Sequence, residues 1–216
     1  MIFNLKSAAL AVMIALSAAP GEMMAQKAGS GVAAKYAAGA VPVVDGKVEF
    51  SQSFELPGKS KSEIYNSLLT FAQSLTKEEG AGEQSRVSRS DEANGLVAVN
   101  MEEMMYFKRT GWVTNATRFY YQLLFEVSDG GYKATLRNIH YLYDEEHNGG
   151  ITYSAEEWIT DDKALVKHGR KLSRYSGKFR TATIDRKDEL FTKAYSAAGG
   201  KIKKRVKKIV YEEVEE

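Results

Sequence analysis

The sequence predicts an α+β fold in which an antiparallel β-sheet carries helices on one face. Two observations predict the sheet: β-branched and aromatic runs recur along much of the chain, and Asp-Gly or Asn-Gly turn signals join them into hairpins. Two Ser-x-x-Glu capping boxes predict helix starts, the first of them opening an amphipathic run. Because the hairpins come mostly first and the helices mostly later, we expect the helices to lie together on one face.

The N-terminal residues 1–25 are predicted to be a signal peptide. Lys6 is followed by an apolar run from Ser7 to Ala19, whose 13 residues are fewer than the roughly 20 that span a bilayer. We expect cleavage after Ala25, and the alternative is a buried N-terminal helix. Residues 26–40 are rich in glycine and alanine and are expected to form a flexible linker. One domain is then expected over residues 41–198.

The first elements of this domain are predicted to be short strands and one helix. Two β-type runs flank Asp45-Gly46, and the second run ends before Pro57-Gly58. Ser60 and Glu63 form a capping box, in which each residue satisfies an orphan backbone N–H of the other. Apolar side chains follow at helical spacing, so we expect a helix over residues 60–79 that covers the sheet.

Two further hairpins are predicted in the middle of the chain. Asn94-Gly95 favours a type I′ turn, in which both central residues have positive φ. Residues 111–115 are expected to form a loop. Two long β-branched and aromatic runs, residues 117–127 and 133–143, then flank Asp129-Gly130-Gly131 and predict the clearest hairpin.

The part of the domain from 154 to 198 is predicted to be helical. Ser154 opens it with the second capping box, and Gly169 and Gly177 are expected to break it. Asp185 is the expected N-cap of a further helix. Residues 199–216 form a charged tail whose six basic residues precede four acids, and we expect it to order only if its apolar stripe docks.

Composition limits the classes of protein that the chain fits. Apolar residues make up 44% and charged residues 27%, as in soluble globular proteins. The net charge of +2 gives no overall preference for anionic partners, so a local patch would have to bind them. The basic runs would suit a nucleic-acid binder, but nucleic acid is not an expected partner of an exported protein. There is no cysteine, which excludes disulfides, a cysteine nucleophile and a lipoprotein anchor. The exported product is therefore expected in the periplasm or outside the cell, without a stable membrane anchor.

Four segments of the chain carry a resemblance to a known family: VPVVDGKVEF at 41–50, LPGKSKSEIYN at 56–66, SRSDEANG at 88–95 and FEVSDGGYKATLRNIHYLYD at 125–144. In this order they resemble DUF4468, a family of exported bacterial domains of unknown function with a fold like that of the TATA-binding protein. The resemblance covers roughly residues 41–145 and implies a curved antiparallel sheet with helices on one face. It implies no activity, and the name of the fold does not imply DNA binding, because function depends on sites.

Tyrosines of the long hairpin form the first candidate ligand-binding surface. Alternation places Tyr121 on one face of the sheet and Tyr120 on the other. In the second strand it places Tyr141 and Tyr143 on one face and Leu136 on the other face. Both faces are then partly apolar, whereas a half-solvated sheet has one polar face. Three covers for the second face are open: the C-terminal helices, a second copy of the chain in a homodimer, or a ligand that stacks on tyrosines.

A basic run at residues 163–180 forms the second candidate surface. Arg170, Lys171 and Arg174 are the residues that we expect to converge on phosphate, sulfate or an acidic polysaccharide, and the alternative is a solvated helix face. No HExxH, EF-hand or Gly-x-Ser-x-Gly pattern occurs, so neither a metal site, a cofactor nor a catalytic residue is expected.

The leading hypothesis for function is a non-enzymatic binding or assembly module of the bacterial cell envelope. It would act through the aromatic-rich sheet face or the basic segment, on an envelope protein or an anionic glycan. The alternative is an envelope hydrolase that uses a pair of carboxylates as acid and base, which requires two acids in one pocket with one displaced pKa.

Overall fold

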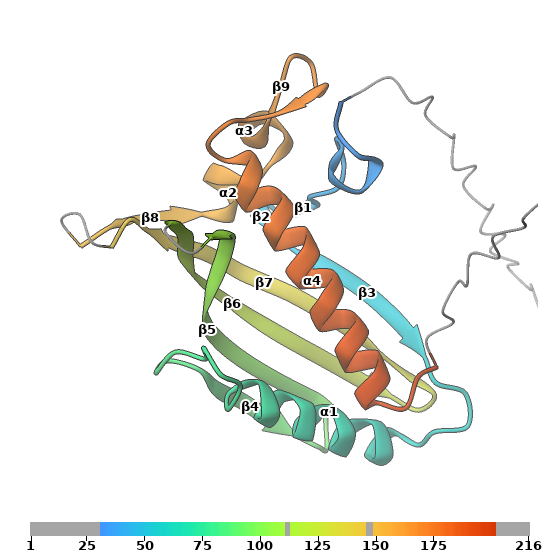
Figure 1. Cartoon of the computed structure of the whole chain (residues 1–216). Coiled ribbons are helices and arrows are strands. Elements are labelled where there is room, and N and C mark those ends of the chain that lie inside the picture. Colours follow the sequence, from blue (N-terminus) through green and yellow to red (C-terminus); the bar gives the residue numbers. More distant parts are fainter. Residues whose placement is uncertain (1–30, 111–112, 146–148, 202–216) are drawn as a thin grey trace, which may run out of the picture.

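The computed structural model describes residues 31–110, 113–145 and 149–201, and these residues form the predicted α+β fold (Figure 1). The sheet is built first along the chain, and the longest helix comes last. In chain order the elements are η1 (Ala34–Tyr36), β1 (Val43–Val44), β2 (Lys47–Val48), β3 (Phe50–Glu55), α1 (Lys61–Leu75), β4 (Arg86–Asp91), β5 (Leu96–Thr110), β6 (Val113–Ser128), β7 (Gly131–Tyr143), β8 (Ile151–Ser154), α2 (Ala155–Trp158), α3 (Asp161–Ala164), β9 (Leu165–Val166), β10 (Lys171–Leu172) and α4 (Gly177–Ala197).

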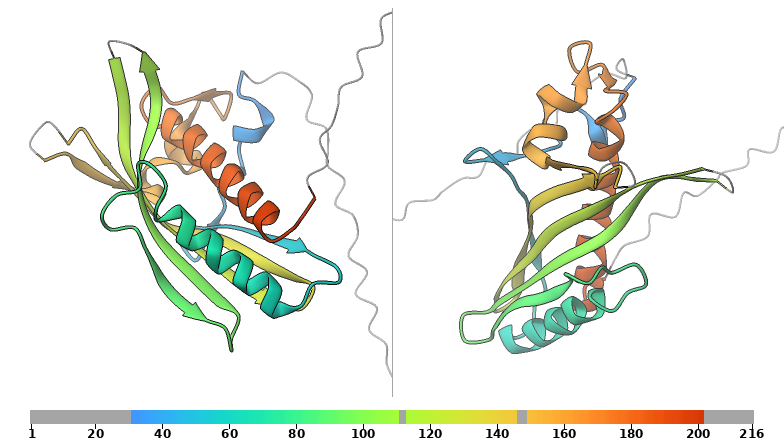
Figure 2. Two further views of the ribbon diagram at one scale, coloured as in Figure 1. Left: turned by 60° about the horizontal axis from the view of Figure 1, so that its bottom comes forward. Right: turned by 90° about the vertical axis from the view of Figure 1, so that its left-hand side faces the viewer.

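The main sheet is antiparallel throughout and has the strand order β3-β7-β6-β5-β4, with β8 also paired to β7. Helices α1 and α4 lie on the same face of this sheet (Figures 1 and 2), as the sequence predicts. The outer parts of β5 and β6 extend beyond the other strands and rise beside the N-terminal end of α4 (Figure 2). The surface between α4 and the outer half of β5 is described below as the candidate site.

Helix α1 begins where the capping box predicts. The Ser60 side chain accepts a hydrogen bond from the backbone N–H of Glu63, and the Glu63 carboxylate accepts one from the backbone of Ser60. The helix ends at Leu75, four residues before the expected end, with Thr76 as its C-cap. Its buried face packs on β5 and β6. These side chains are Ile64, Tyr65, Leu68, Phe71, Ala72 and Leu75.

A β-bulge in β7 changes which of its side chains face the helices. Tyr120 is opposite His140, but Gln122 is opposite Arg137, so β7 has one extra residue between these pairs. Asn138 has a φ of 55° there. The extra residue shifts the alternation, and Leu136, Ile139 and Tyr141 are all buried on one side. The prediction that Leu136 and Tyr141 lie on opposite faces is therefore wrong.

Two loops differ from the sequence predictions. Gly95 has a φ of 67°, but Asn94 is not among the residues with positive φ, so this turn is not type I′. The loop between β4 and β5 has four residues, and the Asp91 carboxylate accepts a hydrogen bond from the backbone N–H of Asn94. The expected loop at 111–115 is also shorter, because strand β6 already begins at Val113.

The C-terminal part is less helical than predicted at its start and more helical at its end. Residues 165–172 form the short β9–β10 hairpin, with Gly169 in its turn, so the basic run is not one helix. Gly177 begins α4 and does not break it, and Asp185 lies inside α4 and is not an N-cap. The helix continues because Phe179, Thr183 and Leu190 provide a buried stripe at helical spacing.

Residues 31–40, the described part of the flexible linker expected at 26–40, pack on the domain. The Val32 side chain is buried, and the Tyr36 hydroxyl donates a hydrogen bond to Asp185 at 2.8 Å. Arg180 of α4 donates hydrogen bonds to the backbone oxygens of Tyr36 and Ala37. Sequence reasoning missed this contact because the hydrogen bonds from Arg180 go to backbone carbonyls, which any glycine- and alanine-rich segment offers.

Two predicted segments lie wholly or mostly outside the described residues. One is the signal peptide at 1–25, and the other is the charged tail, of which only residues 199–201 are described. Among the residues that the structure describes, no helix is long and apolar enough to cross a membrane.

Candidate functional site

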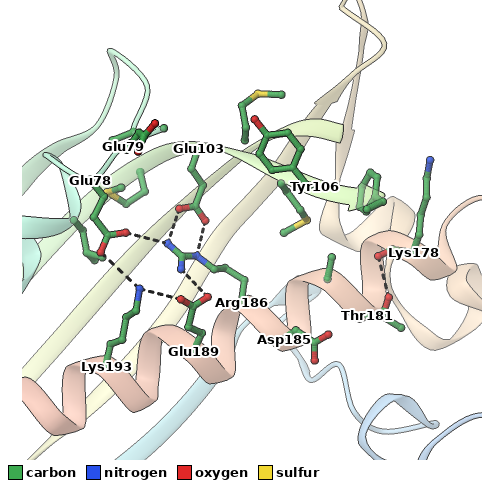
Figure 3. A pocket seen from close by; sticks show the side chains of 18 residues that line it. Glu78, Glu79, Glu103, Tyr106, Lys178, Thr181, Asp185, Arg186, Glu189 and Lys193 are labelled. Carbon is green, nitrogen blue, oxygen red and sulfur yellow. Dashed lines mark hydrogen bonds and ion pairs between the residues drawn. The ribbon is translucent and has the colours of Figure 1, made fainter. Parts of the chain in front are cut away.

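A groove of about 1010 Å³ lies between α4, the outer half of β5 and the turn that follows α1 (Figure 3). Three elements that are distant in the chain form it, and each contributes a different chemistry. Strand β5 contributes methionine and aromatic side chains. Helix α4 contributes charged and small side chains, and the turn after α1 contributes two glutamates.

The apolar wall of the groove follows from the alternation of β5. Met101 and Met105 face the helices and are almost fully buried, while Met104 is 38% exposed. Phe107, the extra residue of a bulge in β5, continues this wall, and its ring centroid lies 4.5 Å from that of Phe179. Methionine side chains adapt to ligands of irregular shape, so this wall suits an apolar ligand group.

A nearly buried ion pair crosses the floor of the groove. The Arg186 guanidinium donates two hydrogen bonds to the Glu103 carboxylate, at 2.8 and 2.7 Å, and it also contacts Glu189 at 2.8 Å (Figure 3). Only 17% of the Arg186 side chain and 14% of the Glu103 side chain are exposed. Burial acts to lower the pKa of Arg186, but the hydrogen bonds that its guanidinium donates to the Glu103 carboxylate raise it above its usual value. The cation is therefore fixed in place before any ligand arrives.

One end of the groove is acidic. Lys193 contacts Glu189 at 2.9 Å and Glu78 at 3.7 Å, and Glu79 is exposed without an ion pair to any described residue. At this end the carboxylates outnumber the cations by four to two. The four carboxylates belong to Glu78, Glu79, Glu103 and Glu189, and the two cations belong to Arg186 and Lys193.

The other end of the groove carries a cation among aromatic rings. The Lys178 ammonium donates hydrogen bonds to Asn115 Oδ1 at 2.9 Å and to the Tyr143 hydroxyl at 3.1 Å. It lies 4.7 Å from the ring centroid of Phe107 and 4.5 Å from that of Tyr143. No carboxylate of the described residues pairs with it. The groove therefore has opposite charges at its two ends.

Tyr121 supplies an unsatisfied polar group behind the ion pair. Its side chain is 3% exposed, and its hydroxyl makes no hydrogen bond of ordinary geometry within the described part of the chain, although Arg186 lies beside it. Burial raises the pKa of Tyr121 well above its usual value, and the charge of Glu103 adds to the shift. A buried hydroxyl without a partner is uncommon and is often explained by an absent water or ligand.

The four tyrosines singled out in the sequence do not form one surface. Tyr121 and Tyr141 lie under the helices, where the Tyr141 hydroxyl forms a 2.7 Å hydrogen bond with Thr183. Tyr120 lies on the open face and stacks on His140 with ring centroids 4.6 Å apart. Tyr143 lies beside Lys178 at the end of the groove. Helices α1 and α4 thus lie together on the face that carries Tyr121 and Tyr141, and the expectation that the C-terminal helices cover the second face is wrong.

The open face of the sheet is more polar than the sequence analysis expects. Asn100 accepts hydrogen bonds from Ser88 and Gln122, and Gln122 accepts one from Arg137, so a polar network crosses four strands. A shallow depression of about 190 Å³ lies beside Tyr120 on this face. These side chains satisfy one another, and a second copy of the chain or a ligand on this face stays a prediction.

The basic run separates into exposed and buried residues. Arg170, Lys171 and Arg174 are all exposed, on the β9–β10 hairpin and the turn after it, and their predicted role in anion binding stays a prediction. Arg180, from the same run, is fully buried and makes hydrogen bonds to Ile159 and Asp161. Across the described ranges, no group of three acidic or histidine side chains is arranged to hold a metal ion.

Sequence reasoning missed the groove because its parts are far apart in the chain. Glu103 and Arg186 are separated by 83 positions, and nothing in the sequence pairs them. One signal was present: Met101, Met104 and Met105 cluster within five residues of a strand. Such a cluster is unusual for a packed strand and typical of adaptable binding surfaces.

Comparisons with known proteins identify relatives but no activity. The sequence model of a family described as "Domain of unknown function (DUF4468) with TBP-like fold" matches residues 50–142. The crystal structure of a DUF4468 family protein from Bacteroides ovatus matches this chain with a TM-score of 0.70 and 36% sequence identity. The match covers 77% of this chain and 95% of the Bacteroides ovatus chain. A TBP-like protein from Parabacteroides distasonis has 24% identity and a TM-score of 0.59, covering 74% and 97%. No curated protein matches the chain.

Proposed function

Since the chain belongs to the DUF4468 family of TBP-like domains, whose description assigns no function, we propose from its own geometry that it is a non-enzymatic binding module of the bacterial cell envelope. The ligand would be held in the groove between α4 and β5. One observation carries the proposal: an adaptable apolar wall lies next to charges that are already fixed by the Glu103–Arg186 pair. A concave surface on which a few polar groups are fixed in place is the usual form of a binding site.

The groove supports this proposal better than the two surfaces expected from the sequence. Helices cover Tyr121 and Tyr141, so a ligand cannot stack on them without opening the core. The exposed cations Arg170, Lys171 and Arg174 lie on a short hairpin and turn, without a cavity around them among those found in the described chain. Of these three surfaces, only the groove combines depth with fixed charges.

The hydrolase alternative gains no support from the titratable groups. A general acid at neutral pH needs a carboxyl group whose pKa is raised. Among the described carboxyl groups with a displaced pKa, each shift is downward. Hydrogen bonds from Arg118 lower the pKa of Glu145. Partial burial acts to raise the pKa of Glu189, but hydrogen bonds from Lys193 and Arg186 lower it overall. These shifts suit structural ion pairs.

A groove-filling variant tests the proposal. Thr181 lines the groove, whereas Thr192 is exposed on the same helix and does not line it. We would immobilise the wild type, Thr181→Tyr and Thr192→Tyr and compare the envelope components that each retains. A component that binds the wild type and Thr192→Tyr but not Thr181→Tyr is the expected result. Equal retention of every component by all three proteins would refute the groove as the site.

Export is a separate part of the proposal and has its own test. The apolar run from Ser7 to Ala19 supports it. N-terminal sequencing of the protein isolated from its native cells is expected to start near Gln26. A start at Met1 would contradict cleavage of a signal peptide.

A further inference from the structure

The two ends of the groove differ in charge and also in shape. At the Lys178 end, the rings of Phe107 and Phe179 are in contact and close the space between β5 and α4. At the other end lie Glu78 and Glu79, in the turn after α1, where side chains are exposed. A chain that enters from the acidic end therefore has to stop beside Lys178.

Lys178 has bonding capacity left for a ligand. An ammonium group has three donors, and two of them serve Asn115 and Tyr143. The described residues offer it no carboxylate, and aromatic faces stabilise a cation without neutralising its charge. An anionic group that reaches this end would receive a charge-assisted hydrogen bond from the third donor.

The acidic end has capacity left for a cation. Glu189 and Glu103 are occupied by Arg186 and Lys193, but Glu79 has no such partner among the described residues. Glu78 is held only by longer contacts, of 3.7 and 3.8 Å. A lysine or arginine side chain of a ligand would therefore find two carboxylates that are not fully neutralised.

The length of the groove sets the size of the ligand. Lys178 and Glu189 lie eleven positions apart on α4, which is about 17 Å at the helical rise of roughly 1.5 Å per residue. An extended polypeptide covers that distance in about five residues at roughly 3.3 Å each. The side chains in between would meet Met105 and Ala182, which are apolar.

We propose that the ligand is the C-terminus of another polypeptide, bound as an extended segment of about five residues. Its α-carboxylate contacts Lys178, its apolar side chains contact the methionine wall, and a basic side chain near the start of the segment contacts Glu78 and Glu79. This inference rests on the proposed function, since it names the ligand class of the same groove.

The test compares two forms of one peptide by titration calorimetry. The peptide is acetyl-Lys-Ala-Leu-Ala-Leu with either a free carboxylate or a C-terminal amide. On the wild type, the free acid is expected to bind at least about tenfold more tightly, as befits a charge-assisted hydrogen bond. On Lys178→Met the ratio of the two affinities should fall to about one, and on the exposed control Lys171→Met it should be unchanged. Because the ratio is taken within each protein, a general loss of stability does not imitate the result.

Three outcomes would overturn the inference. They are equal binding of acid and amide to the wild type, a ratio that survives in Lys178→Met, and binding of neither peptide. In any of these cases, the proposed function still stands if immobilised wild type retains an envelope component that Thr181→Tyr does not retain. Only the ligand class is then wrong. If Thr181→Tyr changes no retention, the proposed function fails as well.

Discussion

Replacing Arg180 by methionine should destabilise the domain strongly. The guanidinium is fully buried and makes four hydrogen bonds, to the backbone oxygens of Tyr36, Ala37 and Ile159 and to the Asp161 carboxylate, at 2.6 to 2.9 Å. Arg180 therefore fastens the N-terminal segment and the start of α3 to α4. Methionine fills much of the same space but leaves all four acceptors without their donor.

The expected loss in the free energy of unfolding is about 4 kcal/mol, because removing one partner of a buried charged pair typically costs about 3–5 kcal/mol. The losses from four separate hydrogen bonds would add up to a larger value. The total is smaller because Ala37 and Asp161 are partly exposed, so water can replace the lost donor at their oxygens. For a domain of this size, each kcal/mol lowers the melting temperature by about 2–4 °C, so a drop of roughly 8–16 °C is expected.

Urea unfolding followed by circular dichroism measures this loss, and Arg174→Met is the matched control. Arg174 belongs to the same basic run but is exposed, so its replacement should change stability by no more than about 0.5 kcal/mol. Limited proteolysis should also cut residues 31–40 faster in Arg180→Met. If Arg180→Met loses no more stability than Arg174→Met, the structural role assigned to the buried guanidinium is wrong.

Two further predictions concern high pH and one glycine. Burial raises the pKa of Tyr121, Tyr132 and Tyr141, so their contribution to stability is present below pH 10 and is lost as the pH rises above it. In a pH titration, the last increase in phenolate absorbance at about 295 nm should therefore coincide with loss of the circular dichroism signal. Ionisation of all tyrosines in a protein that is still folded would contradict this. Gly95→Ala should lower the free energy of unfolding in urea by at least about 1 kcal/mol more than Gly130→Ala. Both glycines have positive φ, but only at Gly95 would the new methyl group clash with the Val127 carbonyl. Equal losses would show that the loop shifts to relieve the clash.

Local signals in the sequence predicted the elements well. Both capping boxes form as expected, at Ser60 and Ser154, because each depends on residues three positions apart. The hairpin around Asp129-Gly130 also forms as predicted. Such features are governed by short-range sterics and hydrogen bonding, which the sequence displays directly.

Features that depend on distant contacts could not be predicted. The bulge at Asn138 is invisible to a rule of strict alternation, although it decides that Leu136 and Tyr141 share a face. The burial of Arg180 depends on carbonyl groups of a segment more than 140 positions away, and arginine in a basic run otherwise indicates solvent. The groove needs both kinds of information, since it combines a strand, a helix and a turn.

The most direct test of the groove as a binding site uses its methionines. Met101 and Met105 face the groove, Met104 lies on the other face of β5, and the other four methionines of the chain lie at or before position 24. Methyl NMR of protein labelled with [¹³C-methyl]methionine, recorded with and without the envelope component that the protein retains, therefore observes the groove directly. We expect the signals of the Met101 and Met105 methyl groups to shift on binding. Binding of the component with both of these signals unmoved would contradict the groove as its site.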